Sequence, residues 1–215
     1  RDRSVSRGLG DVYKRQGIIL AVYACDKNEF HDTGLAYGKH DCSMWEYFAK
    51  DHADWDSVVM MIERAGLVNI FDGTHPQYKE ITFFGITNLS VNQFLVKNLD
   101  ENKAMKYQGV RDIPEEMCRR ILLSHIIPGK KMQQEFDYEV KGTLTGGTIV
   151  KTLSGIDLRV YRIKNPFMGV PDIGEEGLGI HALKSGYQAK VASSNIETTN
   201  GVVHALSYTY QMTEL

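Results

Sequence analysis

The sequence predicts an α+β fold in which helices come first and strands follow. Segments with helical spacing of apolar residues and clear cap signals dominate the first half, up to the break at Pro128-Gly129. After this break, short runs rich in β-branched and aromatic residues alternate with glycine turns. Asn200-Gly201 between two such runs is a strong hairpin signal. This order favours α+β over a sheet of alternating parallel strands and helices.

Two helices are predicted at the start of the ordered region. The segment Ser43–Glu46 has the pattern of a capping box, in which serine and glutamate each bond the other's backbone amide, and it predicts a helix over 44–50. A second helix is expected to begin at Asp54 or Asp56, because apolar residues then recur at helical spacing. Gly66 stands where a left-handed C-terminal cap belongs.

A buried strand and two further helices are predicted next. Ile81–Ile86 is an apolar run of strand length. Ser90 and Gln93 have the spacing of another capping box. Asp112–Glu116 places a proline and acidic residues at a helix start, where they suit the positive end of the helix dipole.

Strands are predicted for most of the second half. The expected strands are Tyr138–Leu144, Thr148–Leu153 and Leu158–Ile163. A glycine- and proline-marked excursion over Asn165–Gly179 is expected to interrupt the sheet. The hairpin centred on Asn200-Gly201 closes the chain.

The first sixteen residues resemble a translated sequencing-library adapter. The adapter codons GAT GTG TAT AAG AGA CAG encode Asp-Val-Tyr-Lys-Arg-Gln, the sequence of Asp11–Gln16. We therefore leave residues 1–16 out of the fold and expect the reading frame to have lost its beginning. The alternative is a basic disordered tail or a mitochondrial presequence.

The next segment resembles the end of a bacterial lipoprotein signal peptide. Residues 17–24 are uncharged and mostly apolar, too short a run for a membrane span of roughly 20 residues. Val22–Cys25 resembles a lipobox, with an unusual Tyr23, so the expected lipidation site is Cys25. Acyl chains there would attach the protein to a membrane. The alternative is a buried strand over 17–24 that ends at Cys25.

Residues 25–42 are predicted to be a flexible linker, because they contain no apolar run and little periodicity. His31-Asp32 and His40–Cys42 contain metal-ligand residue types, but no second cluster completes a site, so no metal is expected. Cys42 and Cys118 could pair in an exported protein, although two cysteines do not make a disulfide framework. The domain itself is expected over 43–215.

Charge and motifs exclude several function classes. The chain has 25 basic and 27 acidic residues. Without residues 1–16 its net charge is near −5, which makes nucleic acid a poor partner. No nucleophile elbow, zinc-protease motif or P-loop is present, and no cofactor is expected. Asp172, Glu175 and Glu176 could be carboxylates for glycoside hydrolysis, but loop spacing does not establish the facing geometry. We expect no catalytic residue and no enzyme activity.

The order of motifs resembles the fasciclin (FAS1) domain family. The resemblance rests on five segments that follow one another in the family's order and cover most of 43–215. They are Arg64–Leu67, Ile81–Asn88, Leu122–Gly129, Gly142–Thr148 and Thr199–Leu206. It implies a wedge of two β-sheets with helices packed on one side.

The resemblance also implies structural roles for the motif residues. Two departures are visible: Gly85-Ile86 stands where Ala-Pro is usual, and Ser124 replaces the tyrosine credited with integrin adhesion in animal members. Two of the motif residues, His125 and His204, are expected to be buried and to donate to nearby carbonyls or hydroxyls. The motif residues are Thr87, Asn88, His125, Pro128, Gly129, Asn200, Gly201 and His204.

The expected function is that of a non-enzymatic surface lipoprotein on the outer membrane of a Gram-negative bacterium. It would mediate adhesion or bind extracellular glycan or protein ligands, with its lipid in the membrane. The alternative is a periplasm-facing structural lipoprotein that associates with envelope partners. Exposed aromatics on the 165–179 excursion would favour ligand capture. The aromatic candidates for glycan contact are Tyr161, Phe167, Tyr187, Tyr208 and Tyr210.

Overall fold

The structure of the chain is a computed structural model that describes residues 38–50 and 54–215. The predicted adapter segment, the signal-peptide segment 17–24, the lipidation site Cys25 and the linker up to residue 37 lie outside the described residues. Residues 38–215 form one unit. The predicted α+β fold is confirmed, with most helices before residue 125 and most strands after it.

The described residues form five α-helices and two short 3-10 turns. They are α2 (Met44–Ala49), α3 (Asp56–Arg64), α4 (Val68–Phe71), α5 (Asn88–Lys97) and α6 (Glu115–Ser124), with the 3-10 turns η1 (Val110–Asp112) and η2 (Gln133–Glu135). The predicted capping box forms at α2, where the Glu46 amide donates to Ser43 Oγ over 3.2 Å. Gly66 has the predicted left-handed backbone, with φ of 64°.

The predicted capping box of Ser90 and Gln93 is wrong. Helix α5 begins at Asn88, three residues before the start that this box implies, and Thr87 occupies its N-cap position without a side-chain cap bond. Ser90 is therefore already inside the helix and buried. Gln93 reaches away from the helix start, and its Nε2 donates to the Tyr208 carbonyl oxygen over 2.7 Å. A tertiary contact has replaced the local one.

In the part of the chain that the structure describes, seven strands form one mixed sheet in the order β2-β1-β7-β6-β5-β4-β3. Strands β1 and β7 pair in parallel, and the other neighbours pair antiparallel. The strands are β1 (Ile81–Gly85), β2 (Ile126–Pro128), β3 (Thr148–Lys151), β4 (Asp157–Lys164), β5 (Glu176–Ala182), β6 (Gln188–Thr198) and β7 (Gly201–Leu206).

Strand β6 joins the two expected sheets into one. Its first residues pair with β5, and its later residues pair with β7. The register with β7 shifts twice, between Val191 and Ser193 and between Ser193 and Ile196. Asn195, inside the second shift, has a φ of 61°. Such bulges bend a strand and increase its twist, so one strand can belong to both parts of the wedge.

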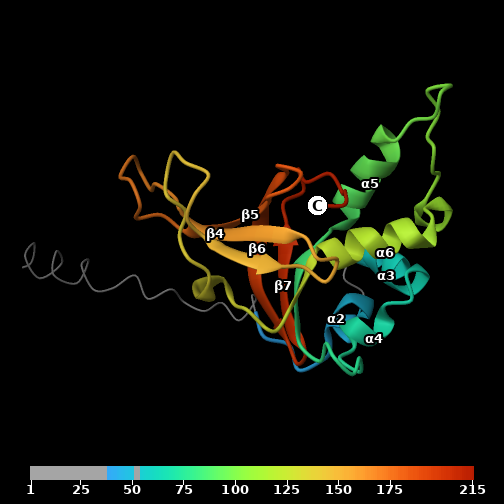
Figure 1. The fold of residues 1–215 in the computed structure, drawn as a ribbon, viewed down its shortest axis with the longest axis horizontal. Coiled ribbons are helices and arrows are strands. Elements are labelled where there is room, and N and C mark those ends of the chain that lie inside the picture. The colour runs from blue at the N-terminus through green and yellow to red at the C-terminus, as the bar shows by residue number, and fades with distance from the viewer. Residues whose placement is uncertain (1–37, 51–53) are drawn as a thin grey trace, which may run out of the picture. The chain divides into compact units, whose positions relative to one another are not determined.

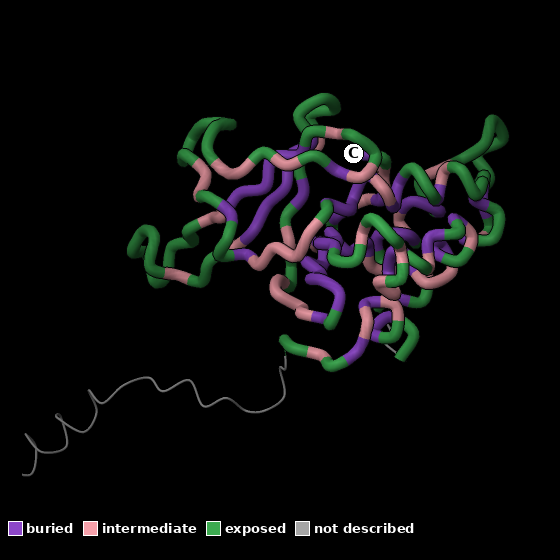
Figure 2. Tube along the Cα trace, turned by 60° about the horizontal axis from the view of Figure 1, so that its bottom comes forward, coloured by how far each residue is buried: buried purple, intermediate pink, exposed green. Residues whose placement is uncertain are grey.

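The helices lie beside the β2-β1-β7 part of the sheet, and β4 and β5 extend away from them (Figure 1). Buried positions run through β1 and β7 on both faces. The burial view shows the same arrangement, with a buried centre and exposed loops beyond the free end of the sheet (Figure 2). Apolar side chains from the helices and both parts of the sheet join in one core, which stabilises the fold mainly by removing apolar surface from water.

Two predicted boundaries in the second half need correction. The segment Tyr138–Leu144 is not a strand, because only Tyr138 and Glu139 form isolated bridges, to Arg162 and Gly146. The excursion after β4 ends earlier than predicted, since β5 already begins at Glu176. Gly177 and Gly179, which suggested a loop in the sequence, lie inside β5.

Residues 38–42, which the prediction placed in the flexible linker, are hydrogen-bonded to the domain. The His40 amide donates to the Glu197 carbonyl oxygen over 2.8 Å, and the Thr199 amide donates to the Cys42 carbonyl oxygen over 2.9 Å. These bonds lay residues 38–42 along the end of β6. Cys42 and Cys118 are both buried and both free, so they do not form a disulfide.

The closing hairpin forms one residue earlier than predicted. Thr198 pairs with Gly201, so the two turn residues are Thr199 and Asn200, and Gly201 is the first residue of β7. Gly201 lies against β1 so closely that a Cβ atom there would stand 2.0 Å from the Ile81 carbonyl oxygen. Only glycine fits this position without moving one of the two backbones.

We expect Gly201→Ala to lower the free energy of unfolding by about 3 kcal/mol, because the added methyl group must push β7 away from β1. Urea unfolding measures this difference. Gly109→Ala is the matched control, since nothing lies within 4 Å of a Cβ atom at that position. If both variants had the stability of the wild type, the close approach of β7 to β1 would be refuted.

Candidate functional site

His125 joins α6 to the C-terminal segment 207–215. Its ring is fully buried, with Nδ1 2.7 Å from the Ile121 carbonyl oxygen and Nε2 2.6 Å from the Tyr210 hydroxyl. A carbonyl oxygen can only accept, so Nδ1 donates to Ile121 and Nε2 accepts from Tyr210. Burial lowers the pKa of His125 to about 4, and the ring is neutral at pH 7.

His204 also connects separate parts of the chain through both nitrogens of its ring. Its Nε2 donates to the Lys131 carbonyl oxygen over 3.0 Å, and its Nδ1 accepts from the Asn195 amide over 3.2 Å. The ring lies between those of Phe84 and Phe136. Burial lowers the pKa of His204 to about 4. Both ring nitrogens are occupied, so His204 supports the bulge of β6 and offers no free group for chemistry.

Asn200 connects the closing hairpin to the first helices. Its Oδ1 accepts from the Met44 amide over 2.7 Å, at the start of α2. Its Nδ2 donates to the Phe71 carbonyl oxygen over 2.9 Å, at the end of α4. One side chain therefore satisfies backbone groups at two helix ends that would otherwise be unpaired.

The remaining motif residues also make internal contacts. Asn88 Oδ1 accepts from the Ser57 amide over 2.7 Å, so Asn88 caps α3 rather than its own helix. Thr82 Oγ1 donates to the Gly129 carbonyl oxygen over 2.7 Å, directly after Pro128. The motif residues thus hold secondary-structure elements together, and a candidate binding site has to be sought elsewhere.

Three of the five candidate aromatic residues meet in one pocket of about 300 Å³. We call it the tyrosine pocket; Tyr161, Tyr187, Gln188, Ala189, Lys190, Thr209 and Tyr210 line it. Its walls come from β4, the start of β6 and the C-terminal segment. Tyr161 and Tyr210 are buried, and Tyr187 is half-buried. Of the other two candidates, Tyr208 is 66% exposed beside Thr209, and Phe167 lies on another loop.

The position of Tyr161 depends on a glycine in the neighbouring strand. Gly179 of β5 pairs with Tyr161 on one side and with Lys190 of β6 on the other. A Cβ atom at Gly179 would stand 2.6 Å from Tyr161 Cζ. The ring of Tyr161 therefore lies across β5, in the space that a side chain would fill, and its hydroxyl end is directed towards β6. This contact explains the glycine at position 179 of β5.

Exposed apolar side chains gather on two loops at the free end of the sheet. We call segments 138–147 and 165–175 the distal loops; they are the yellow and orange loops beyond β4 and β5 (Figure 1). Lys141 and Asp172 form an ion pair between them. The exposed apolar residues are Val140, Leu144, Phe167, Met168, Val170 and Ile173. The predicted excursion thus presents one aromatic and three aliphatic side chains rather than an aromatic cluster.

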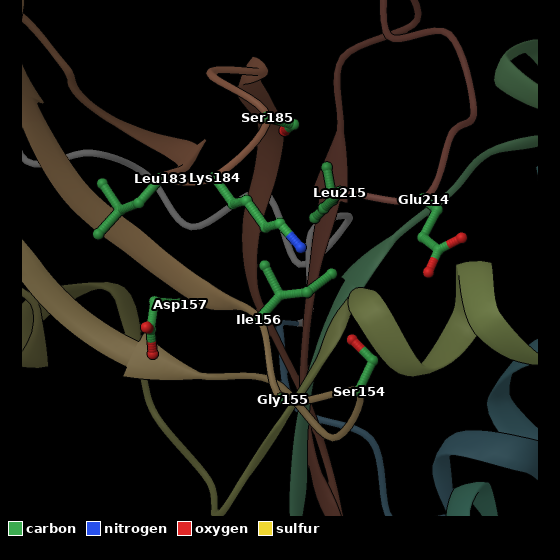
Figure 3. Close-up of a pocket in the computed structure, with 9 residues that line it drawn as sticks. All are labelled: Ser154, Gly155, Ile156, Asp157, Leu183, Lys184, Ser185, Glu214 and Leu215. Atoms are coloured by element: carbon green, nitrogen blue, oxygen red, sulfur yellow. The ribbon is translucent and has the colours of Figure 1, made fainter.

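A second hollow, of about 830 Å³, lies between two turns of the sheet and residues 214–215 (Figure 3). Its lining contains no aromatic ring. Its carboxylates are already paired, Asp157 with Lys151 and Glu214 with Arg120. This hollow is larger than the tyrosine pocket but has fewer groups that could select a ligand.

Two of the three acidic residues considered for catalysis are paired with basic side chains. Glu176 accepts from Arg162 and from the Tyr138 hydroxyl, whereas Asp172 pairs with Lys141. Within residues 38–50 and 54–215, no group of three potential metal ligands comes together. No helix in the described part of the chain has the length and apolar character needed to cross a membrane.

Comparison with known proteins agrees with this architecture. The fasciclin domain family matches residues 53–209. The chain belongs to the fasciclin domain family. The search for similar curated proteins found no match.

A solved structure of a FAS1 domain pair from the insect cell adhesion molecule fasciclin I is similar at 18% identity, with a TM-score of 0.46. The match covers 79% of this chain and 46% of that one, so this chain spans about half of its length.

The motif residues of this family have internal roles in this chain. The departure from the family pattern at Ser124 also has a structural consequence. Ser124, which stands where animal fasciclin domains often carry tyrosine, is fully buried. Its hydroxyl donates to the Ile121 carbonyl oxygen over 2.7 Å and accepts from the Leu215 amide over 3.3 Å. Ser124 therefore helps to hold the C-terminal segment and presents nothing at the surface.

We expect the stability of the domain to depend on pH between about 4 and 6.5 because both core histidines are kept neutral. An unfolded chain protonates histidine near pH 6.5, whereas His125 and His204 have pKa values of about 4 when folded. In this window the unfolded state binds more protons. The free energy of unfolding should therefore rise with pH by about 1.4 kcal/mol per unit for each histidine. Urea unfolding across the window measures the slope.

The variants His125→Gln and His204→Gln test whether the two imidazole rings cause the dependence of the free energy of unfolding on pH. Each should remove about half of the slope, whatever it does to the stability at neutral pH. The comparison uses the slope, so a general loss of stability does not obscure it. Slopes equal to that of the wild type in both variants would contradict the assignment.

Proposed function

We propose that this fasciclin domain is a lipid-anchored binding module on the outer surface of a Gram-negative cell, where it mediates adhesion by binding extracellular glycans. The tyrosine pocket is the observation that carries the proposal. Membership of a family associated with adhesion supports it. The internal hydrogen bonds of the motif residues agree with a module that binds rather than reacts.

The pocket has the composition that glycan recognition requires. A sugar ring has apolar C–H faces and a hydroxyl edge, so it suits a site where aromatic rings and a few polar groups converge. The tyrosine pocket offers three rings together with Gln188, Lys190 and Thr209. Tyr208, mostly exposed next to it, extends the aromatic surface towards the rest of a longer chain of sugars.

Anchoring at Cys25 fits the position where the described domain begins. Twelve residues separate Cys25 from Gly38, and they could span at most about 40 Å. Such a tether would hold the domain near the membrane and leave it free to turn towards a ligand. Two or more acyl chains on Cys25 would give stable anchoring.

A second candidate is a periplasm-facing structural lipoprotein with envelope partners. The exposed apolar residues of the distal loops favour it, because an apolar patch of this kind is typical of a protein contact. In this candidate the distal loops bind a partner protein, and glycan binding has no part.

Protease treatment of intact cells distinguishes the two. The chain is produced with a complete signal peptide and a C-terminal tag, beside a matched Cys25→Ala variant. We expect the tagged protein to be cleaved on intact cells and to fractionate with membranes. The Cys25→Ala variant should lose the membrane fraction and appear in a soluble one.

Protection on intact cells, followed by cleavage once the outer membrane is permeabilised, would overturn the surface location and support the periplasmic candidate. Equal membrane association of the Cys25→Ala variant would overturn the lipid anchor. Each outcome therefore decides one part of the proposal.

A further inference from the structure

The hydroxyl of Tyr161 has no hydrogen-bond partner among the described residues. The side chain is 7% exposed, and its hydroxyl is absent from the polar atoms that are both enclosed and unpaired. It therefore reaches solvent at the tyrosine pocket, which Tyr161 lines. A phenol donates one hydrogen bond and accepts others. Because this hydroxyl is open to the pocket and bound to no described protein group, it can donate a hydrogen bond to a ligand there.

A buried cation, Arg159, lies against the ring of Tyr161. Arg159 is 3% exposed, and no described carboxylate pairs with it. Its Nε donates to the Gly146 carbonyl oxygen over 2.7 Å, and its Cζ lies 4.2 Å from the centre of the Tyr161 ring. A buried cation bound only to neutral groups keeps its attraction for an anion, because little water screens it.

Lys190 adds a second cation at the mouth of the pocket. It is exposed and has no ion-pair partner among the described residues. It lies opposite Gly179, across which the Tyr161 ring extends, so ammonium and hydroxyl belong to the same face of the sheet. The pocket lining contains no acidic residue. Glu139, whose charge also acts on Tyr161, lines a different hollow.

We infer that the tyrosine pocket binds a carboxylate-bearing sugar unit, a hexuronic acid residue of a glycan, with Tyr161 and Lys190 as its polar contacts. This inference rests on the proposed glycan-binding function and names the chemical class of its ligand. The carboxylate lies between the Lys190 ammonium and the Tyr161 hydroxyl. The apolar face of the sugar packs on the tyrosine rings, and its hydroxyls meet Gln188 and Thr209.

The shape and size of the site support one sugar unit rather than a small anion. A pocket of about 300 Å³ is at the lower end of ligand sites, which suits a single ring whose neighbours continue over the rim. A small anion such as acetate would use the cation but leave the tyrosine rings without contact. A neutral sugar would use the rings but leave Lys190 unpaired.

Calorimetric or NMR titration of the purified full chain tests this with four probes: glucuronate, galacturonate, glucose and acetate. We expect at least one uronate to bind about tenfold or more tightly than glucose and acetate, and its binding to weaken as salt is raised. Equal binding of glucose would overturn the role of the carboxylate. Equal binding of acetate would overturn the sugar. No binding of either uronate would overturn the inference.

Single substitutions then locate the site. Tyr161→Phe removes only the hydroxyl that has no partner, so the fold should keep its stability while uronate binding weakens about tenfold. Lys190→Gln should weaken uronate binding by a similar factor and abolish the preference over glucose. Lys184→Gln is the matched control, because it removes the same charge from the neighbouring turn, outside the tyrosine pocket, and it should bind like the wild type.

Wild-type binding by Tyr161→Phe and Lys190→Gln, or equal losses in Lys184→Gln, would place the ligand elsewhere. The titration uses purified protein, so it is independent of the cell experiment. A surface-exposed chain that binds no uronate would keep the proposed function and remove this site. A protease-protected chain that binds uronate would keep the site and remove the surface location.

Discussion

The parallel pairing of β1 with β7 is the contact on which the rest of the domain depends. These two strands lie at the centre of the helix-covered part of the sheet, buried on both faces, with β2 and β6 as their outer neighbours. Gly201 allows the two backbones to approach at the point where the pairing begins. Asn200, one residue earlier, bonds the same end of the pair to α2 and α4. Helices that would be marginal alone are thereby held by tertiary contacts.

Much of the helical part could be predicted because its signals are local. The Ser43 capping box, the left-handed Gly66 and the proline before α6 each concern residues within one turn of one another. The errors arise where a distant partner competes with a local one. Gln93 has the spacing of a capping box with Ser90, but its side chain bonds the distant Tyr208 carbonyl oxygen instead. Tyr138 forms only an isolated backbone bridge to Arg162 of β4, and its ring stacks on the guanidinium group of the same residue.

The tyrosine pocket could not be predicted from the sequence, because it also depends on contacts between residues that are distant in the chain. Tyr161, Tyr187 and Tyr210 could each be named as aromatic candidates, but their meeting depends on strand register. Gly179 is informative only when it stands between Tyr161 and Lys190; in the sequence it resembles part of a glycine-rich loop. The unpaired hydroxyl of Tyr161 and the uncompensated charge of Arg159 are properties of burial, which a sequence does not contain.

The central strand pair also constrains when the domain can fold. Positions 81 and 201 are paired although 120 residues separate them, so the middle of the sheet cannot form until nearly the whole chain has been synthesised. Contacts of such long range make folding slow. An emerging chain therefore lacks its central strand pair until β7 has been synthesised. Completion of this last strand then commits the chain to the folded state.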